Sequence, residues 1–254
     1  MNRNILAASH FQSAGEAYAK FRPTYPPELA EYLAAQCSQK NLALEVGCGT
    51  GQFTGLLAHR FAKIIATDVS ASQIESAKPI ENVRFLVEPA EQISVESGSV
   101  NLIVAAQAAH WFNLPEFYQE VRRIAHPDCV LALVNYGVLA IEDDVCNARF
   151  RQFYYDEIGP YWPPERQHVD NGYASFDFPF AELQQPELAI ERNWNLEQFL
   201  GYIRTWSLVK TATKAGKSSL MENFAEELTA LWNEPDKCRK ITWPITMRIG
   251  RVRP

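Results

Sequence analysis

Three glycines, Gly47, Gly49 and Gly51, fall within five residues in the stretch LALEVGCGTGQF, residues 42–53, directly after a short apolar run. Glycine lets the backbone pass close to a ligand, and a strand, a glycine turn and a helix together form a common cradle for anions and nucleotides. Here the spacing is GxGxG, with Gln52 where a dinucleotide-binding GxGxxG loop has its third glycine. A phosphate-binding loop would carry Gly-Lys-Ser/Thr, which this stretch lacks. The spacing disfavours both phosphate-binding interpretations.

An acid, Glu45, stands two residues before the first glycine, at the expected carboxyl end of the strand. A carboxylate at this position would repel a pyrophosphate, whereas a cationic ligand would not be repelled. The charge of Glu45 therefore favours a cation over a phosphate and disfavours a nicotinamide-dependent dehydrogenase.

The loop needs a sheet to position it, and the apolar runs of the first half of the chain predict one. Five short apolar runs alternate with helical or turn segments, at residues 42–46, 63–67, 83–87, 100–106 and 129–136. Helical spacing follows Tyr25, with Leu29, Ala30, Leu33, Ala34 and Cys37 on one face, and appears again at 114–125. Runs that are apolar on both faces are typical of parallel strands covered by helices. We therefore expect an α/β, doubly wound, mostly parallel sheet, whose ligand binds at the carboxyl ends of its strands.

The second half of the chain has a different pattern of residues. Residues 143–182 are rich in aromatic residues and prolines without a sustained period, which predicts an irregular insertion. Two amphipathic helices are predicted at 196–207 and 218–232, with a polar connector at 209–219 between them. Strict alternation at 240–252 predicts an antiparallel strand, although Pro244 lies within it and a missing N–H is costly inside a sheet.

These segments predict a single domain over 1–254. Its parts are an N-terminal helical segment at 1–40, a ligand-binding core at 41–136, an insertion and helical cap at 143–232 and a final strand at 240–254.

Composition excludes several classes of protein. The net charge is −6 and no run of lysine or arginine stands out, so a nucleic-acid partner is not expected. The apolar stretches are far shorter than the roughly 20 residues of a membrane span, and the first residues lack the apolar centre of a secretory signal. Five cysteines and five histidines show no metal-binding spacing, so we expect neither a metal nor a disulfide framework. The sequence predicts a soluble, cytoplasmic protein.

The glycine stretch LEVGCGTGQFT resembles motif I of the class I S-adenosylmethionine-dependent methyltransferases. This resemblance implies a seven-stranded Rossmann-like fold with an antiparallel C-terminal strand, S-adenosylmethionine as the cofactor and S-adenosylhomocysteine as the product. Asp68 matches the family's ribose-binding acid, the segment EPAEQI matches the loop beside adenine, and Gln107 follows the fourth strand. The implied cofactor-binding residues are Glu45, Gly47, Cys48, Gly49, Gly51, Asp68, Val69, Ala90, Glu91 and Gln107. Taken singly, Asp68 could instead cap a helix and Glu91 could be a solvated loop acid.

Other segments, AYAKFRPTYPPEL, AQAAHWFN, FLGYIRTWS and WPITMRIGRV, resemble the trans-aconitate methyltransferase-like branch of small-molecule enzymes. The resemblance implies a small-molecule acceptor, for which a carboxylate is a candidate. An ionised carboxylate would need arginines or hydrogen-bond donors, for which Arg22 and Arg204 are the candidates, although Arg22 could also be a surface residue. His110 would donate a hydrogen bond to a carboxylate or remove a proton from a hydroxyl or amine. The candidate walls of the acceptor site are Tyr18, Trp111 and Trp206, the last of which could also belong to the core.

Several alternatives remain open from the sequence. The acceptor could be a hydroxyl, an amine or a macromolecule, and the chain could bind the cofactor in a regulatory module without turnover. The sequence leaves the oligomeric state open between monomer and dimer.

Overall fold

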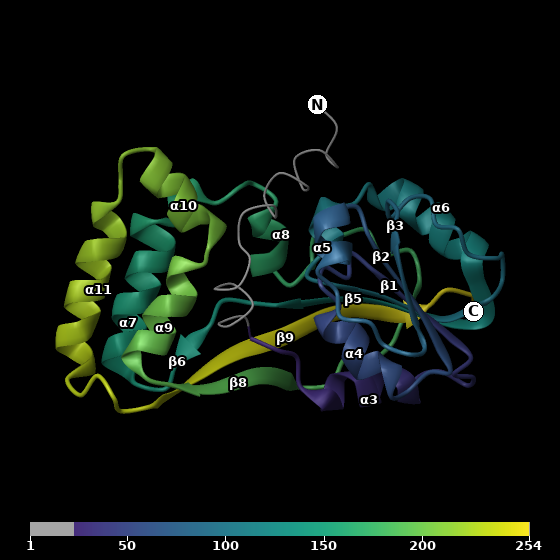
Figure 1. Ribbon diagram of the computed structural model, residues 1–254, viewed down its shortest axis with the longest axis horizontal. Helices are drawn as coiled ribbons and strands as arrows, with labels where there is room; N and C mark the ends of the chain where they lie inside the picture. The colour runs from purple at the N-terminus through teal and green to yellow at the C-terminus, as the bar shows by residue number, and fades with distance from the viewer. Residues whose placement is uncertain (1–22, 254) are drawn as a thin grey trace.

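The computed structural model describes residues 23–253, which form one central sheet with helices on both faces and a helical cap at one end (Figure 1). The sheet runs in the order β3-β2-β1-β4-β5-β9-β6. Its parallel strands are β1 (Leu42–Val46), β2 (Lys63–Asp68), β3 (Val83–Val87), β4 (Val100–Ala106) and β5 (Ala125–Tyr136). The helices around them are α3 (Pro27–Ala35), α4 (Gln52–Ala58), α5 (Ala71–Glu75) and α6 (Leu114–Ile124). The predicted doubly wound sheet is confirmed, and β5 begins four residues earlier than the apolar run that predicted it.

Side chains of β4 show how the sheet separates two cores. Leu102 and Val104 pack on one face with α3 and α4, while Ile103 and Ala105 pack on the other face with α6. Because successive side chains of a strand point to opposite faces, a strand that is covered on both sides must be apolar throughout. All seven residues of β4 are buried, as this arrangement requires.

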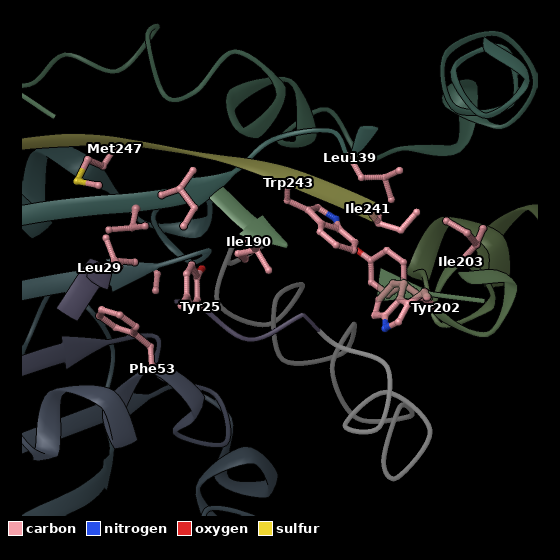
Figure 2. Packing of buried hydrophobic residues seen from close by; sticks show 14 of the residues in the cluster. Tyr25, Leu29, Phe53, Leu139, Ile190, Tyr202, Ile203, Ile241, Trp243 and Met247 are labelled. Carbon is pink, nitrogen blue, oxygen red and sulfur yellow. The ribbon is translucent and has the colours of Figure 1, made fainter. Parts of the chain in front are cut away.

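The last strand, β9 (Arg239–Arg251), is antiparallel to β5, as its alternating sequence predicts. Ile241, Trp243, Ile245, Met247 and Ile249 are all buried, and Figure 2 shows three of them, Ile241, Trp243 and Met247. The predicted difficulty at the proline has a simple resolution, because the N–H and C=O of one strand residue point to the same side. Pro244 directs its carbonyl to the N–H of Gly137, 2.9 Å away, in the gap where β5 has ended and β6 (Ala140–Ile141) has not begun. The missing N–H therefore lies beyond the last paired residues of β5 and β9, Tyr136 and Ile245, where the ladder is already interrupted.

The sheet contains nine strands, whereas the methyltransferase resemblance implies seven. Besides the five parallel strands and β9 there are three more, β6, β7 (Ala181–Glu182) and β8 (Leu188–Trp194), and all three pair with β9. β8 alternates exposed residues such as Glu191 with buried ones such as Ile190, and the sequence analysis does not predict this strand.

The predicted irregular insertion is wrong for much of its length, because residues 144–170 are mainly helical. They form α7 (Asp144–Gln152), the π-helix η2 (Phe153–Glu157), the 3-10 helix η3 (Gly159–Tyr161) and α8 (Arg166–Asp170). The helical period of α7 is obscured because its buried face includes a cation, Arg149, which pairs with Glu157 and Glu227. The apolar pattern alone therefore could not predict the helix.

The cap is completed by α9 (Leu196–Arg204), α10 (Ser207–Lys214) and α11 (Ser219–Trp232). The two predicted helices are confirmed, but most of the predicted polar connector forms α10, whose Leu208, Val209 and Ala212 are buried. Trp243 of β9 joins the cap to the sheet, with its ring centroid 5.3 Å from Trp194 and 5.5 Å from Tyr202 of α9 (Figure 2). The cap and the core thus share one strand.

No helix in the described part of the chain is long and apolar enough to cross a membrane.

Two leucines of α11 test how the cap is packed. Leu228 is fully buried and Leu231 is 38% exposed. Leu228→Ala should lower the free energy of unfolding by about 2–5 kcal/mol, because it leaves a cavity, whereas Leu231→Ala should change it by about 0.5 kcal/mol or less. Urea denaturation of both variants measures the difference. Equal losses would show that α11 does not pack through this face.

Candidate active site

The glycine loop leaves the carboxyl end of β1 and turns at once into α4. Gly47, Gly49 and Gly51 all have positive φ angles, +73°, +57° and +81°, a region that side chains with a Cβ rarely enter. A Cβ on Gly47 would lie 2.4 Å from the Cβ of Ala108, and a Cβ on Gly51 would lie 2.9 Å from the ring of Phe85. Gly47 and Gly51 therefore allow close packing behind the loop, while a Cβ on Gly49 would meet nothing nearer than 3.8 Å.

Asp68, at the end of β2, fixes the shape of this loop. Its Oδ2 accepts a hydrogen bond from the N–H of Gly49 at 2.8 Å, and its Oδ1 accepts one from the N–H of Ser70 at 2.8 Å. The carbonyl of Thr67 accepts two further bonds, from the N–H groups of Gly47 and Cys48. Each carboxylate oxygen can accept more than one bond, so Asp68 can hold the loop and also accept from a ligand hydroxyl.

A cavity opens above the loop at the carboxyl ends of β1, β2 and β4. It is lined by Tyr25, Glu45, Val46, Gly47, Cys48, Gly49, Thr50, Gln52, Phe53, Asp68, Val69, Ser70, Gln73, Glu88, Pro89, Ala90, Ala106, Gln107, Ala108, Trp111 and Phe112. Three of these residues are acidic, and none is lysine or arginine. Such a lining repels phosphate groups and favours a cation. The sulfonium and ammonium of S-adenosylmethionine fit this donor set, and the pyrophosphate of a dinucleotide does not.

Glu45 reaches the cavity from β1 although its side chain is almost fully buried, at 2% exposure. It accepts a hydrogen bond from the hydroxyl of Thr54, on the first turn of α4. A buried carboxylate needs such partners to offset the loss of water. Burial raises the pKa of the neighbouring Cys48 thiol, and the charges of Glu45 and Asp68 raise it further. Cys48 therefore stays protonated and serves the loop rather than acting as a nucleophile.

Gln107 closes the cavity at the end of β4 in a strained backbone conformation. Its φ is +56°, which is uncommon for a residue other than glycine. The side-chain amide donates to the carbonyl of Tyr136 at 2.9 Å, and the backbone N–H donates to Val134. Strain of this kind persists where surrounding bonds hold it, and it gathers at functional sites.

Most of the predicted cofactor residues meet at this cavity, but two do not line it. Gly51 lies behind the loop, at the start of α4. Glu91 turns away, because its Oε1 accepts the N–H of Asn113 at 2.8 Å, at the start of α6. Glu91 thus matches neither the contact to adenine nor the solvated loop acid of the sequence analysis, because its carboxylate holds the start of α6. Sequence reasoning missed Tyr25, Phe53, Ser70, Gln73, Glu88 and Phe112, although Ser70 and Glu88 lie within two residues of predicted positions.

His110 lies one residue before Trp111 in the 3-10 turn η1 (Ala109–Trp111), outside the lining of the cofactor cavity. Its Nδ1 lies 3.0 Å from the hydroxyl of Tyr173, and its ring centroid lies 5.1 Å from that of Trp111. Burial lowers the pKa of His110 to about 3, and the positive charges of Arg166 and His168 act in the same direction. The imidazole is therefore neutral near pH 7 and can still donate or accept one hydrogen bond.

Tyr173 holds His110 at the cost of backbone strain. Its φ is +61°, a genuine outlier for a bulky residue, and its side chain is fully buried. The ring stacks on Phe176 with centroids 4.6 Å apart, and the Tyr173 carbonyl accepts a bond from Arg248. The stack and the bond fix the hydroxyl beside the imidazole.

Arg166 of α8 is a further candidate residue that sequence reasoning missed. Its Nε donates to the hydroxyl of Tyr154 at 3.1 Å and to Oδ1 of Asp170 at 2.9 Å. Its guanidinium lies 4.6 Å from the centroid of the Trp162 ring. Burial acts to lower its pKa, but Tyr154 and Asp170 more than offset this, so the pKa is raised and the charge is permanent. The aromatic residues around it were visible in the sequence, but their convergence on Arg166 was not.

The remaining predicted acceptor residues have different outcomes. Tyr18 and Arg22 lie outside the described residues. Arg204 is exposed at the end of α9 and lines no cavity described in the structure. Trp206 packs among the aromatic rings near Arg166, with its ring centroid 5.8 Å from those of both Tyr154 and Trp162.

The roles of Asp68 and Glu91 can be distinguished by measuring the binding of S-adenosylmethionine, the ligand that the motif resemblance implies. Asp68→Asn should weaken binding by about 1–3 kcal/mol, because a charged acceptor that also orders the loop is lost. Glu91→Gln keeps an acceptor for Asn113 outside the cavity and should leave the affinity unchanged. Isothermal titration of both folded variants measures this. Unchanged affinity in Asp68→Asn would remove Asp68 from the site, and weakened affinity in Glu91→Gln would return Glu91 to it.

The lowered pKa of His110 predicts a pH dependence of stability. Between about pH 6.5 and 3 the unfolded state binds a proton that the folded state refuses, so the free energy of unfolding should fall as the pH falls. The contribution is at most about 1.4 kcal/mol per pH unit. His110→Gln should reduce this slope in urea denaturation at pH 4.5, 5.5 and 7. An identical slope in the variant would contradict the buried neutral state.

Comparison with known proteins agrees with this geometry. Residues 44–133 match the family model described as a methyltransferase domain. A Dictyostelium discoideum protein provisionally named a methyltransferase is 34% identical over 247 residues, which are 95% of this chain and 94% of that protein. A solved structure from Anaeromyxobacter dehalogenans, provisionally assigned as a type II methyltransferase, has a TM-score of 0.87 at 38% identity and covers 92% of this chain and 99% of its own.

A relative that matches a shorter segment of this chain carries a more specific name. The malonyl-acyl-carrier protein O-methyltransferase of Priestia megaterium is 34% identical over 104 residues, 39% of this chain and 38% of that protein. The acidic cavity above a GxGxG loop, the matching family model and the full-length relatives agree with one another. The chain belongs to the class I S-adenosylmethionine-dependent methyltransferases.

Proposed function

We propose that this methyltransferase esterifies a carboxylate of a small-molecule acceptor. The observation that carries the proposal is the pattern of hydrogen bonds made by the Arg166 guanidinium. Its Nε is bonded to Tyr154 and Asp170, whereas its two Nη groups have no hydrogen-bond partner among residues 23–253. A guanidinium with both Nη groups available matches the two oxygens of a carboxylate. The proposal assigns to Arg166 the anchoring role for which the sequence analysis offers Arg22 and Arg204 as candidates.

The chemistry of a carboxylate acceptor suits Arg166 and His110. When bound, S-adenosylmethionine supplies an electrophilic methyl group, which the acceptor oxygen takes as the C–S bond breaks and its electron pair stays on sulfur. A carboxylate is already ionised at neutral pH, so no residue has to remove a proton from it. The protein then needs mainly to hold the acceptor in line, and such positioning can contribute about 7–11 kcal/mol.

His110 fits a positioning role in this reaction better than the role of a base. A general base is most effective when its pKa lies near the working pH, and that of His110 is lowered to about 3. A neutral imidazole can instead donate a hydrogen bond to one acceptor oxygen, with Tyr173 fixing the ring. The state of His110 thus disfavours the alternative of a hydroxyl or amine acceptor.

Two likenesses support the proposal. The Priestia megaterium relative is named for methyl transfer to an oxygen of a malonyl group, and malonate carries carboxylates. The sequence also resembles the trans-aconitate methyltransferase-like branch, and we propose that the chain belongs to it. A small acceptor and a cytoplasmic location are parts of the same proposal, and a macromolecular acceptor is its alternative.

Arg166→Gln tests the proposed anchor. We expect the KM for carboxylic acids to rise at least tenfold, because a charged bidentate contact is lost, while the affinity for S-adenosylmethionine stays unchanged. Arg166→Lys should rescue only part of the loss, since lysine lacks the fork. Arg151→Gln is the matched control, because Arg151 lies over the exposed ring of Tyr155. Methyl ester formation is measured by mass spectrometry.

Screening of acids, amides, alcohols and amines tests the chemical class itself. Methyl esters from acids only are the expected result. Methylation of alcohols or amines without any ester would overturn the proposal, and so would a kcat that falls below pH 6.5 as a single base becomes protonated.

A further inference from the structure

Glu45 of the cofactor cavity is flanked by apolar residues on both neighbouring strands. It belongs to β1, and the residues aligned with it are Ala66 of β2 and Val104 of β4. Both of these residues are fully buried. Aligned residues of parallel strands direct their side chains to the same face, so the Glu45 side chain leaves the sheet between two apolar neighbours. A carboxylate in this position has lost most of its water and needs hydrogen-bond donors from the protein.

Thr54 supplies such a donor from the far end of the glycine loop. Its hydroxyl donates to Oε2 of Glu45, and its side chain is fully buried in the first turn of α4. The two residues are nine positions apart in the sequence, with the whole glycine loop between them. The bond therefore ties the strand before the loop to the helix after it.

The direction of the Thr54 hydroxyl differs from that of other helical threonines in this chain. Thr211, Thr213 and Thr229 each donate to the carbonyl four residues earlier in their own helix. This is the common local bond of a threonine within a helix. Thr54 instead donates to a side chain of the neighbouring strand, so its hydroxyl serves Glu45 rather than α4.

A hydroxyl that donates to a carboxylate affects both its charge and its orientation. Such a bond favours the ionised form over the protonated form and restricts rotation of the carboxylate. The ionised form of Glu45 adds negative charge to a cavity whose described lining contains no lysine or arginine. Removal of the hydroxyl should therefore reduce the attraction between Glu45 and a cationic ligand.

We propose that Thr54 is a positioning residue for the methyl donor, whose hydroxyl holds the Glu45 carboxylate ionised and oriented to attract the positive charge of S-adenosylmethionine. Thr54 is not among the residues that line the cavities described in the structure, so it acts through Glu45. This inference concerns the donor and does not depend on the proposed esterification. It differs from a purely mechanical role, in which the bond would only fix the glycine loop.

Two ligands of different charge test this role. Thr54→Val removes the hydroxyl and keeps the shape of the side chain. We expect its Kd for S-adenosylmethionine to rise at least tenfold. The Kd for 5′-methylthioadenosine, which has the nucleoside and the thioether but neither positive charge, should change less than twofold. Isothermal titration measures both. Equal weakening of the two ligands, or an unchanged Kd for S-adenosylmethionine, would overturn the proposal.

Two further variants identify the hydroxyl as the responsible group. Thr54→Ser keeps a hydroxyl and should bring the Kd for S-adenosylmethionine to within threefold of the wild-type value. Thr213→Val is the matched control, because it removes a hydroxyl that donates to the carbonyl of Val209 in its own helix. This control should leave both affinities unchanged. A Thr54→Ser variant as weak as Thr54→Val would contradict the proposal.

A double-mutant cycle separates the charge from the fixing of the loop. Glu45→Gln keeps an oxygen that can accept from Thr54 but removes the charge, and it should raise the Kd for S-adenosylmethionine at least tenfold. Adding Thr54→Val to Glu45→Gln should change the Kd less than twofold, because no charge remains for the hydroxyl to stabilise. A further tenfold loss in the double variant would overturn the proposal in favour of the mechanical role. An unchanged Kd in Glu45→Gln alone would overturn it whether or not Thr54→Val folds.

Discussion

The site depends on one carboxylate that accepts two backbone N–H groups. Asp68 ends β2, and its oxygens hold Gly49 of the neighbouring loop and Ser70 of its own. The glycine loop has no side chains with which to stabilise itself, and its positive φ angles carry an entropic cost. By joining the ends of β1 and β2, Asp68 fixes the floor of the cavity, and the close approach of Gly47 to Ala108 places the end of β4 against it.

Much of the cofactor site could be predicted from the sequence because it depends on local order along the chain. Parallel strands bring their carboxyl ends to one edge, so residues that follow successive strands must meet there. Glu45, Asp68, Ala90 and Gln107 do meet there. Glu91 does not line the cavity, because a neighbouring helix start offered its carboxylate an unpaired N–H group. Whether the Asn113 N–H lies within reach of Glu91 depends on the tertiary position of α6, which the order of residues along the chain does not specify.

The proposed acceptor side could not be predicted in the same way, because its residues come from segments with no shared period. Arg166, His110 and Tyr173 come from α8, the turn after β4 and the loop after α8. Their positions depend on the partly exposed ion pair of Arg166 with Asp170, on packed aromatic rings and on a strained tyrosine, which are all tertiary features. Periodicity also failed for α7, where a buried Arg149 paired with two glutamates replaces an apolar residue. Patterns of apolar residues do not report buried polar contacts.

β9 gives the two halves of the molecule a common frame. Its first residues pair with β6 and β8 beside the cap, and its last residues pair with β5 in the core. Changes in the insertion can therefore alter the proposed acceptor side without moving the strand ends that line the cofactor cavity. The single long strand therefore separates the cap segment of the sequence from the segments that form the cofactor cavity. It also marks residues 142–238 as the segment to exchange when acceptor choice is to be redesigned.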